Sequence, residues 1–256
     1  MKTTENTILI TGGGTGIGRG LAEAFQKLGN KVIIAGRREG VLVETVKANP
    51  GMEYLTLDTG STQSIQAFTK GLTTRFPALN VVVHSAGIMK TEDLRRPETA
   101  IAEETVAINL LGPIRLTAAL LPGLLKQPHA AILTVSSGLA FTPLSLNPTY
   151  CATKAAIHSY TQSLRYQLRD TAVRVIEIVP PYVQTELTGA HQARDPMAMP
   201  LKDYLEETMS LLQASPDVQE VLVERVKPLR FAEARGDYDA FYTNMNDRLV
   251  KARSPR

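Results

Sequence analysis

Two residue types that exchange protons lie one helical turn apart near the middle of the chain. Tyr150 and Lys154 are four residues apart, so on a helix their side chains share one face. A neighbouring ammonium stabilises a phenolate and so lowers a tyrosine pKa from about 10 towards the range in which the hydroxyl exchanges a proton with a substrate. A chain with 8 tyrosines produces such a pair by chance, so its surroundings must support the prediction.

Those surroundings include a serine that follows a short apolar segment. Residues 131–135 predict a buried strand that ends at Ser136, Ser137 and Gly138. Ser137 precedes Tyr150 by 13 residues, and a loop rich in proline and small residues joins them. A serine hydroxyl beside a phenol could hydrogen-bond a substrate oxygen and stabilise its developing charge. We therefore expect acid–base chemistry where this strand ends.

A glycine-rich turn follows the first predicted strand, 7–10, and leads into a predicted helix. Glycines let the backbone touch a pyrophosphate, and a helix N-terminus offers it free N–H groups. Such a turn can also be merely tight, but its position between strand and helix predicts a dinucleotide site. The expected contacts are Thr11, Gly12, Thr15, Gly16, Ile17 and Gly18.

The second predicted strand ends at Ala35-Gly36-Arg37-Arg38, without a carboxylate. An acidic residue here would accept hydrogen bonds from the adenosine ribose of NAD, whereas guanidinium groups can bind the 2′-phosphate of NADP. We predict that NADP(H) is preferred over NAD(H), with Arg37 as the first candidate. Arg38 could instead stack on adenine, and a solvated turn with two surface arginines is the alternative.

Short β-branched runs alternate with longer stretches of helical spacing, which is typical of βαβ units. The central runs do not alternate with polar residues, as expected when helices cover both faces of a parallel sheet. We predict an α/β fold: a single-domain, Rossmann-like, doubly wound parallel sheet over residues 1–256. The expected strands are 7–10, 31–35, 54–57, 81–84, 131–135 and 173–179.

Composition excludes several classes of protein. At 43% hydrophobic and 21% charged, the chain is neither disordered nor fibrous. A net charge of +3 without a dense basic run gives no support for nucleic-acid binding. The apolar stretch 106–125 contains Asn109, Pro113 and Arg115, so we predict no membrane span.

The N-terminus lacks the pattern of a secretory signal. One cysteine, Cys151, cannot close an intramolecular disulfide, which fits a reducing compartment, and we expect a cytoplasmic protein. The four histidines are scattered along the chain, so we expect no metal site.

Together these motifs resemble the short-chain dehydrogenases/reductases, from about Thr7 to Leu187. The family pattern TGxxxGxG falls on Thr11, Gly12, Gly16 and Gly18. The family's catalytic residues fall on Asn109, Ser137, Tyr150 and Lys154. Its further cofactor contacts fall on Asp58, Ala86, Gly87, Pro180, Val183 and Thr185, with Tyr150 and Lys154 also facing the cofactor.

The sequence departs from this family in two places. The usual Asn-Asn-Ala-Gly is His84-Ser85-Ala86-Gly87, and we expect His84 to be a hydrogen-bonded structural residue rather than a catalytic one. The usual Val-Asp-Gly-Gly near the C-terminus is absent. Residues 223–247 most resemble the branch of oxidoreductases named after the D-alanyl-lipoteichoic-acid operon.

The resemblance implies hydride transfer between a nicotinamide and a carbonyl or alcohol carbon. Tyr150 would donate or accept the proton, Ser137 would bind the substrate oxygen, and Lys154 would hold the ribose. Two alternatives stay open: an NADP(H)-binding regulatory or scaffold protein without turnover, and a sugar-nucleotide epimerase or dehydratase. The second normally needs a larger C-terminal domain.

We expect a small-molecule substrate, with an apolar carbonyl compound or secondary alcohol favoured. The pocket candidates, each of which could also belong to the core, are Met89, Leu139, Phe141, Leu144, Tyr182 and Leu187. We expect residues 186–235 to form a substrate lid and 236–256 a tail. The apolar helices around 103–127 and 149–169 suggest a homodimer or homotetramer, as the resemblance implies.

Overall fold

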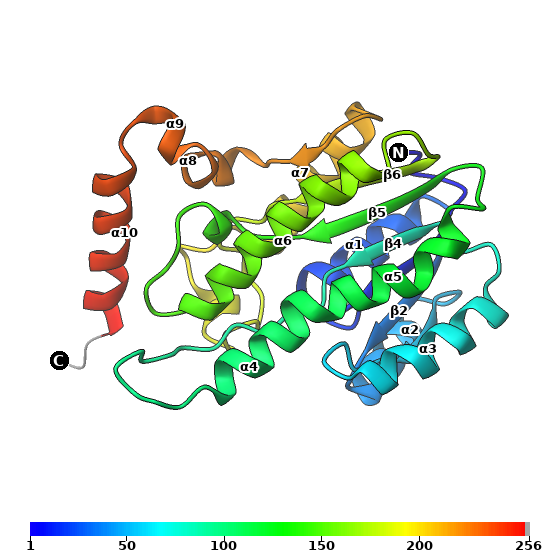
Figure 1. The fold of residues 1–256 in the computed structure, drawn as a ribbon, viewed down its shortest axis with the longest axis horizontal. Coiled ribbons are helices and arrows are strands. Elements are labelled where there is room, and N and C mark those ends of the chain that lie inside the picture. Colours follow the sequence, from blue (N-terminus) through cyan, green and yellow to red (C-terminus); the bar gives the residue numbers. More distant parts are fainter. Residues whose placement is uncertain (254–256) are drawn as a thin grey trace.

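Parallel strands joined by helices form one sheet in the computed structural model, which describes residues 1–253, with side chains up to 249. Within that range the strand order is β3-β2-β1-β4-β5-β6-β7 (Figure 1). The strands are β1 (Thr7–Thr11), β2 (Lys31–Gly36), β3 (Glu53–Thr56), β4 (Val81–His84), β5 (Ala130–Val135), β6 (Val173–Ile178) and β7 (Glu220–Val221).

Helices cover both faces of this sheet. The long helices before β6 are α1 (Gly16–Lys27), α2 (Glu39–Ala48), α3 (Thr62–Arg75), α4 (Ala100–Val106), α5 (Gly112–Leu124) and α6 (Pro148–Gln167). A π-helical segment, η1 (Ala107–Leu111), joins α4 to α5, and a 3-10 turn, η2 (Gly138–Ala140), follows β5. Beyond β6 come η3 (Gln192–Arg194), α7 (Leu201–Ala214), η4 (Glu224–Val226), α8 (Lys227–Arg230), α9 (Ala232–Arg235) and α10 (Tyr238–Arg253).

Alternation along β1 shows why the sheet is doubly wound. Ile8 and Ile10 point into one core, which includes Phe25 of α1 and Tyr204 of α7. Leu9 points into the opposite core with side chains from α3, α5 and α6. Successive side chains of a strand face opposite ways, so an unbroken apolar run must be covered on both sides. The predicted fold class is confirmed.

The predicted strands lie within two residues of those observed, but the C-terminal third differs from the expected lid. Helix α7 packs against α1: Tyr204 is fully buried, and Leu205 lies against Gly20. Strand β7, which was not predicted, pairs with β6 through Glu177 and Glu220. Of the segment 186–235, only about 186–200 precedes these core elements.

The helical run Ala100–Leu124 has the length and composition of a membrane span, with a mean hydropathy of 1.4. In the fold it lies along the sheet, where Leu116, Leu120 and Leu124 are buried in the core shared with α3. A helix that packs one face against the sheet therefore accounts for part of this apolar run.

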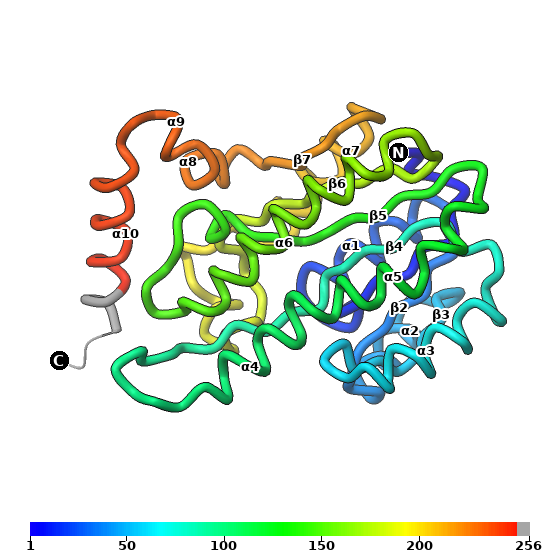
Figure 2. The backbone as a smooth tube through the Cα atoms, viewed as in Figure 1, coloured from blue at the N-terminus to red at the C-terminus, as the bar shows by residue number. Residues whose placement is uncertain are grey.

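Helix α10 stands apart from the sheet at the C-terminal end of the chain (Figure 2). Among the side chains of α10 up to residue 249, Asn246 is buried and ties the helix to the rest: it accepts a hydrogen bond from Ser145 N at 2.6 Å and donates one to Pro143 O at 3.2 Å. The expected tail is thus attached to the loop that precedes α6.

Candidate active site

The four predicted catalytic residues gather where β4 and β5 end. Ser137 follows β5, Tyr150 and Lys154 occupy the first turns of α6, and Asn109 lies in η1. All four are at least 90% buried. Because the carboxyl ends of parallel strands meet at one edge, residues distant in sequence converge there.

The Ser137 hydroxyl lies near the Tyr150 phenol and lowers its pKa. The Ser137 hydroxyl also accepts a hydrogen bond from Leu139 N at 3.1 Å, which fixes its position at the start of η2. Burial raises the pKa of Tyr150 to about 12, an effect that the neighbouring Ser137 hydroxyl partly offsets. The sequence had suggested a lowered pKa. In the chain alone the loss of hydration is the largest effect on this pKa.

The cation next to Tyr150 is the ammonium group of Lys154. Its Nζ donates to the Val135 carbonyl oxygen at 2.8 Å and lies 5.5 Å from the centre of the Tyr150 ring. Burial lowers the pKa of Lys154 to about 8, although the carboxylate of Glu177 acts in the opposite direction. The lysine can therefore gain or lose a proton near neutral pH.

Asn109 is held by three contacts. Its Oδ1 accepts from Ile88 N at 2.9 Å, and its Nδ2 donates to Ile88 O at 2.9 Å and to Thr153 Oγ1 at 3.3 Å. The π-helical turn that carries it inserts an extra residue into the helix, a feature frequent at functional sites. Gly87 fits between this residue and Lys154: a Cβ there would lie 3.4 Å from Asn109 Oδ1 and 3.8 Å from Lys154 Nζ.

The glycine-rich turn comes into close contact with the loop after β4. A Cβ on Gly12 would lie 2.9 Å from the Ala86 backbone, and one on Gly18 would lie 2.3 Å from the Gly12 carbonyl oxygen. The Thr11 hydroxyl accepts from both Ser85 N and Ala86 N at 3.1 Å. Thr11 therefore ties the two loops together.

The start of α1 lies in that same turn. Thr15 is its extended N-cap and offers no side-chain bond to the first turn, which begins at Gly16 and includes Ile17. The first N–H groups of a helix have no partner within the helix. A tight glycine turn ahead of uncapped N–H groups is the arrangement that suits a pyrophosphate.

At the predicted adenosine end, Arg37 and Arg38 follow β2. The Arg37 side chain is about half exposed, and its Nη1 lies 3.9 Å from Glu104 of α4, which also pairs with Lys90. Arg38 is the N-cap of α2. Asp58 accepts from Gly60 N at 2.9 Å, which shapes the loop after β3.

At the predicted nicotinamide end, the sequence analysis missed one residue. Pro180 O accepts from Gly138 N at 2.8 Å, linking this loop to the turn after Ser137. The Val183 carbonyl and the Thr185 hydroxyl both accept from Gln192 Nε2, at 2.8 and 3.1 Å. No motif pointed to Gln192, because its contacts cross a loop of irregular structure.

The pocket candidates fall into three groups. Leu144 forms a small apolar cluster with Tyr150 and Cys151, and Met89 and Leu139 pack against it. Phe141 belongs to a different environment: its ring lies 4.7 Å from His158 and 4.5 Å from Arg230. Tyr182 and Leu187 are both exposed, and the Tyr182 hydroxyl donates to Asp195 at 3.0 Å.

Comparisons with known proteins identify the family of this chain. The sequence profile described as short chain dehydrogenase matches residues 6–196. The chain is 41% identical over 253 residues to the uncharacterized oxidoreductase DltE of Bacillus subtilis (strain 168), covering 96% of this chain and 98% of that protein. The chain belongs to the short-chain dehydrogenase family. The resemblance to the branch named after the D-alanyl-lipoteichoic-acid operon is confirmed as well.

Solved structures of short-chain dehydrogenases resemble this one closely. A serine dehydrogenase in complex with NADP+ has a TM-score of 0.75 at 25% identity, covering 83% of this chain and 93% of that one. A short-chain dehydrogenase from Streptomyces avermitilis has a TM-score of 0.80 at 20% identity over the full length of both chains, which supports the fold.

His84 replaces an asparagine of the short-chain dehydrogenase pattern and is almost fully buried. Its Nε2 is hydrogen-bonded to the Thr117 hydroxyl of α5 at 2.9 Å. Burial lowers the pKa of His84 to about 4, so the ring is neutral at physiological pH. A hydrogen-bonded structural histidine thus joins β4 to α5.

One cluster of possible metal ligands lies behind Lys154. Among the described residues, His158, Glu177 and Glu220 have ligand atoms within 4.8 Å of one another. His158 Nδ1 lies 2.7 Å from the fully buried Glu177 carboxylate, and Arg230 donates to Glu220 at 2.9 and 3.2 Å. A metal ion would have to compete with Arg230, so the cluster is better described as an ion-pair network.

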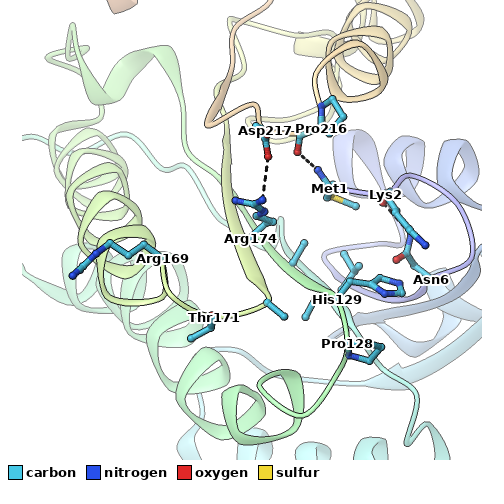
Figure 3. Close-up of a pocket in the computed structure, with 14 residues that line it drawn as sticks. Met1, Lys2, Asn6, Pro128, His129, Arg169, Thr171, Arg174, Pro216 and Asp217 are labelled. Atoms are coloured by element: carbon cyan, nitrogen blue, oxygen red, sulfur yellow. Dashed lines mark hydrogen bonds and ion pairs between the residues drawn. The ribbon is translucent and has the colours of Figure 1, made fainter.

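A cavity of about 380 Å³ lies at the opposite edge of the sheet, where the strands begin (Figure 3). Arg174 pairs with Asp217 there at 3.2 Å, and the amino group of Met1 is hydrogen-bonded to Pro216 O. The predicted catalytic residues follow the other ends of the strands, so this cavity is not part of their site. At this cavity the N-terminus is held against the loop that follows α7.

Because His84 is buried in its neutral form, we expect the protein to lose stability in acid. Its pKa is lower in the folded chain than in the unfolded one, so between about pH 6.5 and 4 the unfolded chain binds the extra proton and stability falls as pH falls. From about pH 7 to 5 this costs roughly 2 kcal/mol. Urea unfolding should be measured at both pH values for the wild type and for His84→Asn. The free energy of unfolding of the variant should fall by roughly 2 kcal/mol less than that of the wild type. An equal loss in both proteins would contradict a buried neutral ring.

Proposed function

We propose that this chain is an NADP(H)-dependent oxidoreductase that interconverts a carbonyl and an alcohol. The observation that carries the proposal is that the buried hydroxyls of Ser137 and Tyr150 converge beside the ammonium of Lys154. Binding a dinucleotide requires neither hydroxyl. A phenol aligned by a serine and backed by a cation is suited to exchange a proton with a substrate oxygen.

The residues fit a nicotinamide dinucleotide. The turn at Gly12 and Gly18 leaves no space for a Cβ, so only glycines allow the loops to lie so close together. We assign the pyrophosphate to this turn and to the start of α1, and the adenine to Asp58. When bound, the nicotinamide supplies or accepts the hydride.

The proton is handled by the chain itself. In reduction, Tyr150 Oη gives its proton to the oxygen that was the carbonyl, while Ser137 Oγ donates a hydrogen bond to that oxygen and stabilises its charge. The Lys154 ammonium opposes the negative charge left on the phenol. Asn109 holds the loop at Ile88 in place, with both of its amide atoms engaged.

The pocket favours a small apolar carbonyl compound or secondary alcohol. Met89, Leu139 and Leu144 are among the apolar side chains of the cluster that contains Tyr150. We propose that residues 186–200, which carry the exposed Leu187, cover the substrate. Because the lone Cys151 is a free thiol, we place the reaction in the reducing cytoplasm.

Cofactor choice can be tested at Arg37. Its guanidinium is half exposed and follows a strand end without a carboxylate, so it can bind a 2′-phosphate. Arg37→Ala should reduce the preference for NADPH over NADH by roughly 10- to 150-fold, the equivalent of losing about 1.5–3 kcal/mol. Binding titrations with both cofactors check this. Arg75→Ala, which removes a comparably exposed arginine bound to Glu53, is the control. Equal wild-type affinity for both cofactors would refute the assignment.

Catalysis can be separated from binding at Tyr150. Tyr150→Phe should lower kcat by about 100-fold or more on any carbonyl compound that the wild type reduces, with NADPH affinity nearly unchanged. Lys154→Met should reduce both. Tyr166→Phe makes the same change at an exposed position of α6 and should have no effect. Wild-type turnover by Tyr150→Phe would mean that the proton takes another route.

Assembly is a further expectation. Members of this family often form oligomers, and the helical run 100–124 is only partly buried within one chain. We propose that this run and α6 pair across a two-fold axis. Light scattering at micromolar concentration should give two or four times the chain mass of 27.9 kDa. A monomer would contradict the proposal.

A further inference from the structure

Gln192 is a buried glutamine whose side-chain amide is bonded at both ends. It begins η3 and is 4% exposed. Its Oε1 accepts from the backbone N of Thr188 at 3.0 Å and from the Thr188 hydroxyl at 2.8 Å. Because a backbone N–H can only donate, the oxygen must face Thr188. The amide nitrogen is therefore the atom that faces Val183 and Thr185.

That nitrogen determines which hydrogen bonds Thr185 can still make. The Thr185 hydroxyl accepts from Gln192 Nε2 at 3.1 Å and from Leu187 N at 3.4 Å. A hydroxyl has two acceptor lone pairs and one proton to donate. With both lone pairs engaged, Thr185 can meet a ligand only as a donor.

The carbonyl of Val183 is constrained in a similar way. Val183 forms a parallel bridge with Met199 through the backbone groups of its neighbours, since Met199 N donates to Tyr182 O and Gln184 N donates to Met199 O. The N–H and C=O of Val183 itself therefore point to the other side. Gln192 Nε2 binds this carbonyl at 2.8 Å and leaves its second lone pair for a donor.

We propose that Gln192 is a positioning residue for the nicotinamide carboxamide: it presents Thr185 as a donor and Val183 as an acceptor, the pair that a primary amide requires. The carboxamide oxygen would accept from Thr185 Oγ1, and its NH₂ group would donate to the Val183 carbonyl. This inference rests on the proposed function, since it requires that a nicotinamide binds here.

The competing interpretation is that the Gln192 amide occupies the place of the cofactor amide and is displaced by it. The contacts favour positioning, because displacement would break four hydrogen bonds of a buried side chain. The two interpretations predict opposite effects on cofactor affinity when the amide donor is removed. Loss of a positioning residue weakens binding, and loss of a competitor strengthens it.

The variant Gln192→Glu keeps the acceptor that Thr188 uses and replaces the amide donor with a carboxylate oxygen. Calorimetry would measure two ligands: NADPH and 2′-phospho-ADP-ribose, which has the same adenosine and pyrophosphate groups but no nicotinamide. We expect NADPH to bind about 3- to 10-fold more weakly, the effect of losing one hydrogen bond, and 2′-phospho-ADP-ribose to bind as in the wild type.

Gln184 provides a matched control. It is also a glutamine of this loop, and its Nε2 donates to Asp195 O at 3.2 Å. Gln184→Glu loses an amide donor to the same segment without touching the Val183 carbonyl or the Thr185 hydroxyl, so it should leave the affinity ratio of the two ligands unchanged. If Gln192→Glu fails to fold, Gln192→Met, which is similar in size and uncharged, takes its place with the same expected result.

Three results would overturn the inference: an unchanged ratio in the Gln192 variant, tighter NADPH binding, or an equal loss in the Gln184 variant. Failure of the proposed function would look different. In that case the wild type would bind neither ligand, or would bind NADPH no better than 2′-phospho-ADP-ribose.

Discussion

A buried ammonium group constrains the end of the sheet where the predicted catalytic residues gather. Lys154 is almost fully removed from water, so its charge must be met by the protein, and it donates to a backbone carbonyl at the end of β5. That bond holds the first turns of α6 against the sheet, and Tyr150, one turn earlier, is placed beside Ser137 as a result. The Glu177 carboxylate, anchored by His158, further stabilises the charge.

Burial has opposite effects on the two proton-exchanging groups, and both follow from the same loss of hydration. It raises the pKa of the Tyr150 phenol and lowers that of the Lys154 ammonium, which favours the neutral form of each. In the chain alone, Tyr150 is therefore held as a proton donor. The polar side chains around the pair are bonded to backbone groups, as Asn109 is to Ile88 and Gln192 is to Val183, so their positions are set by the chain itself.

The sequence predicted the sheet well because its central strands are buried on both faces and read as unbroken apolar runs. Strand β7 was not predicted because it has two residues, too few to show a periodic pattern. Helix α7 was predicted to be part of a lid because a surface helix and a core helix have similar composition. The predicted catalytic set rests on motif spacing, which the order of strands and helices converts into proximity. Gln192 could not be found this way, since its role depends on side-chain bonds across an irregular loop. The raised pKa of Tyr150 could not be predicted from the sequence either, because it depends on burial.

The central claim is that the buried Ser137–Tyr150–Lys154 group turns over a substrate and does not merely accompany a binding site. Its most direct test measures the wild type in two ways: NADPH binding by fluorescence, and loss of NADPH absorbance with a panel of small apolar ketones and aldehydes. We predict binding together with oxidation of NADPH by members of the panel. Tight binding with no oxidation by any of these carbonyl compounds would contradict the claim and favour a regulatory NADP(H)-binding protein.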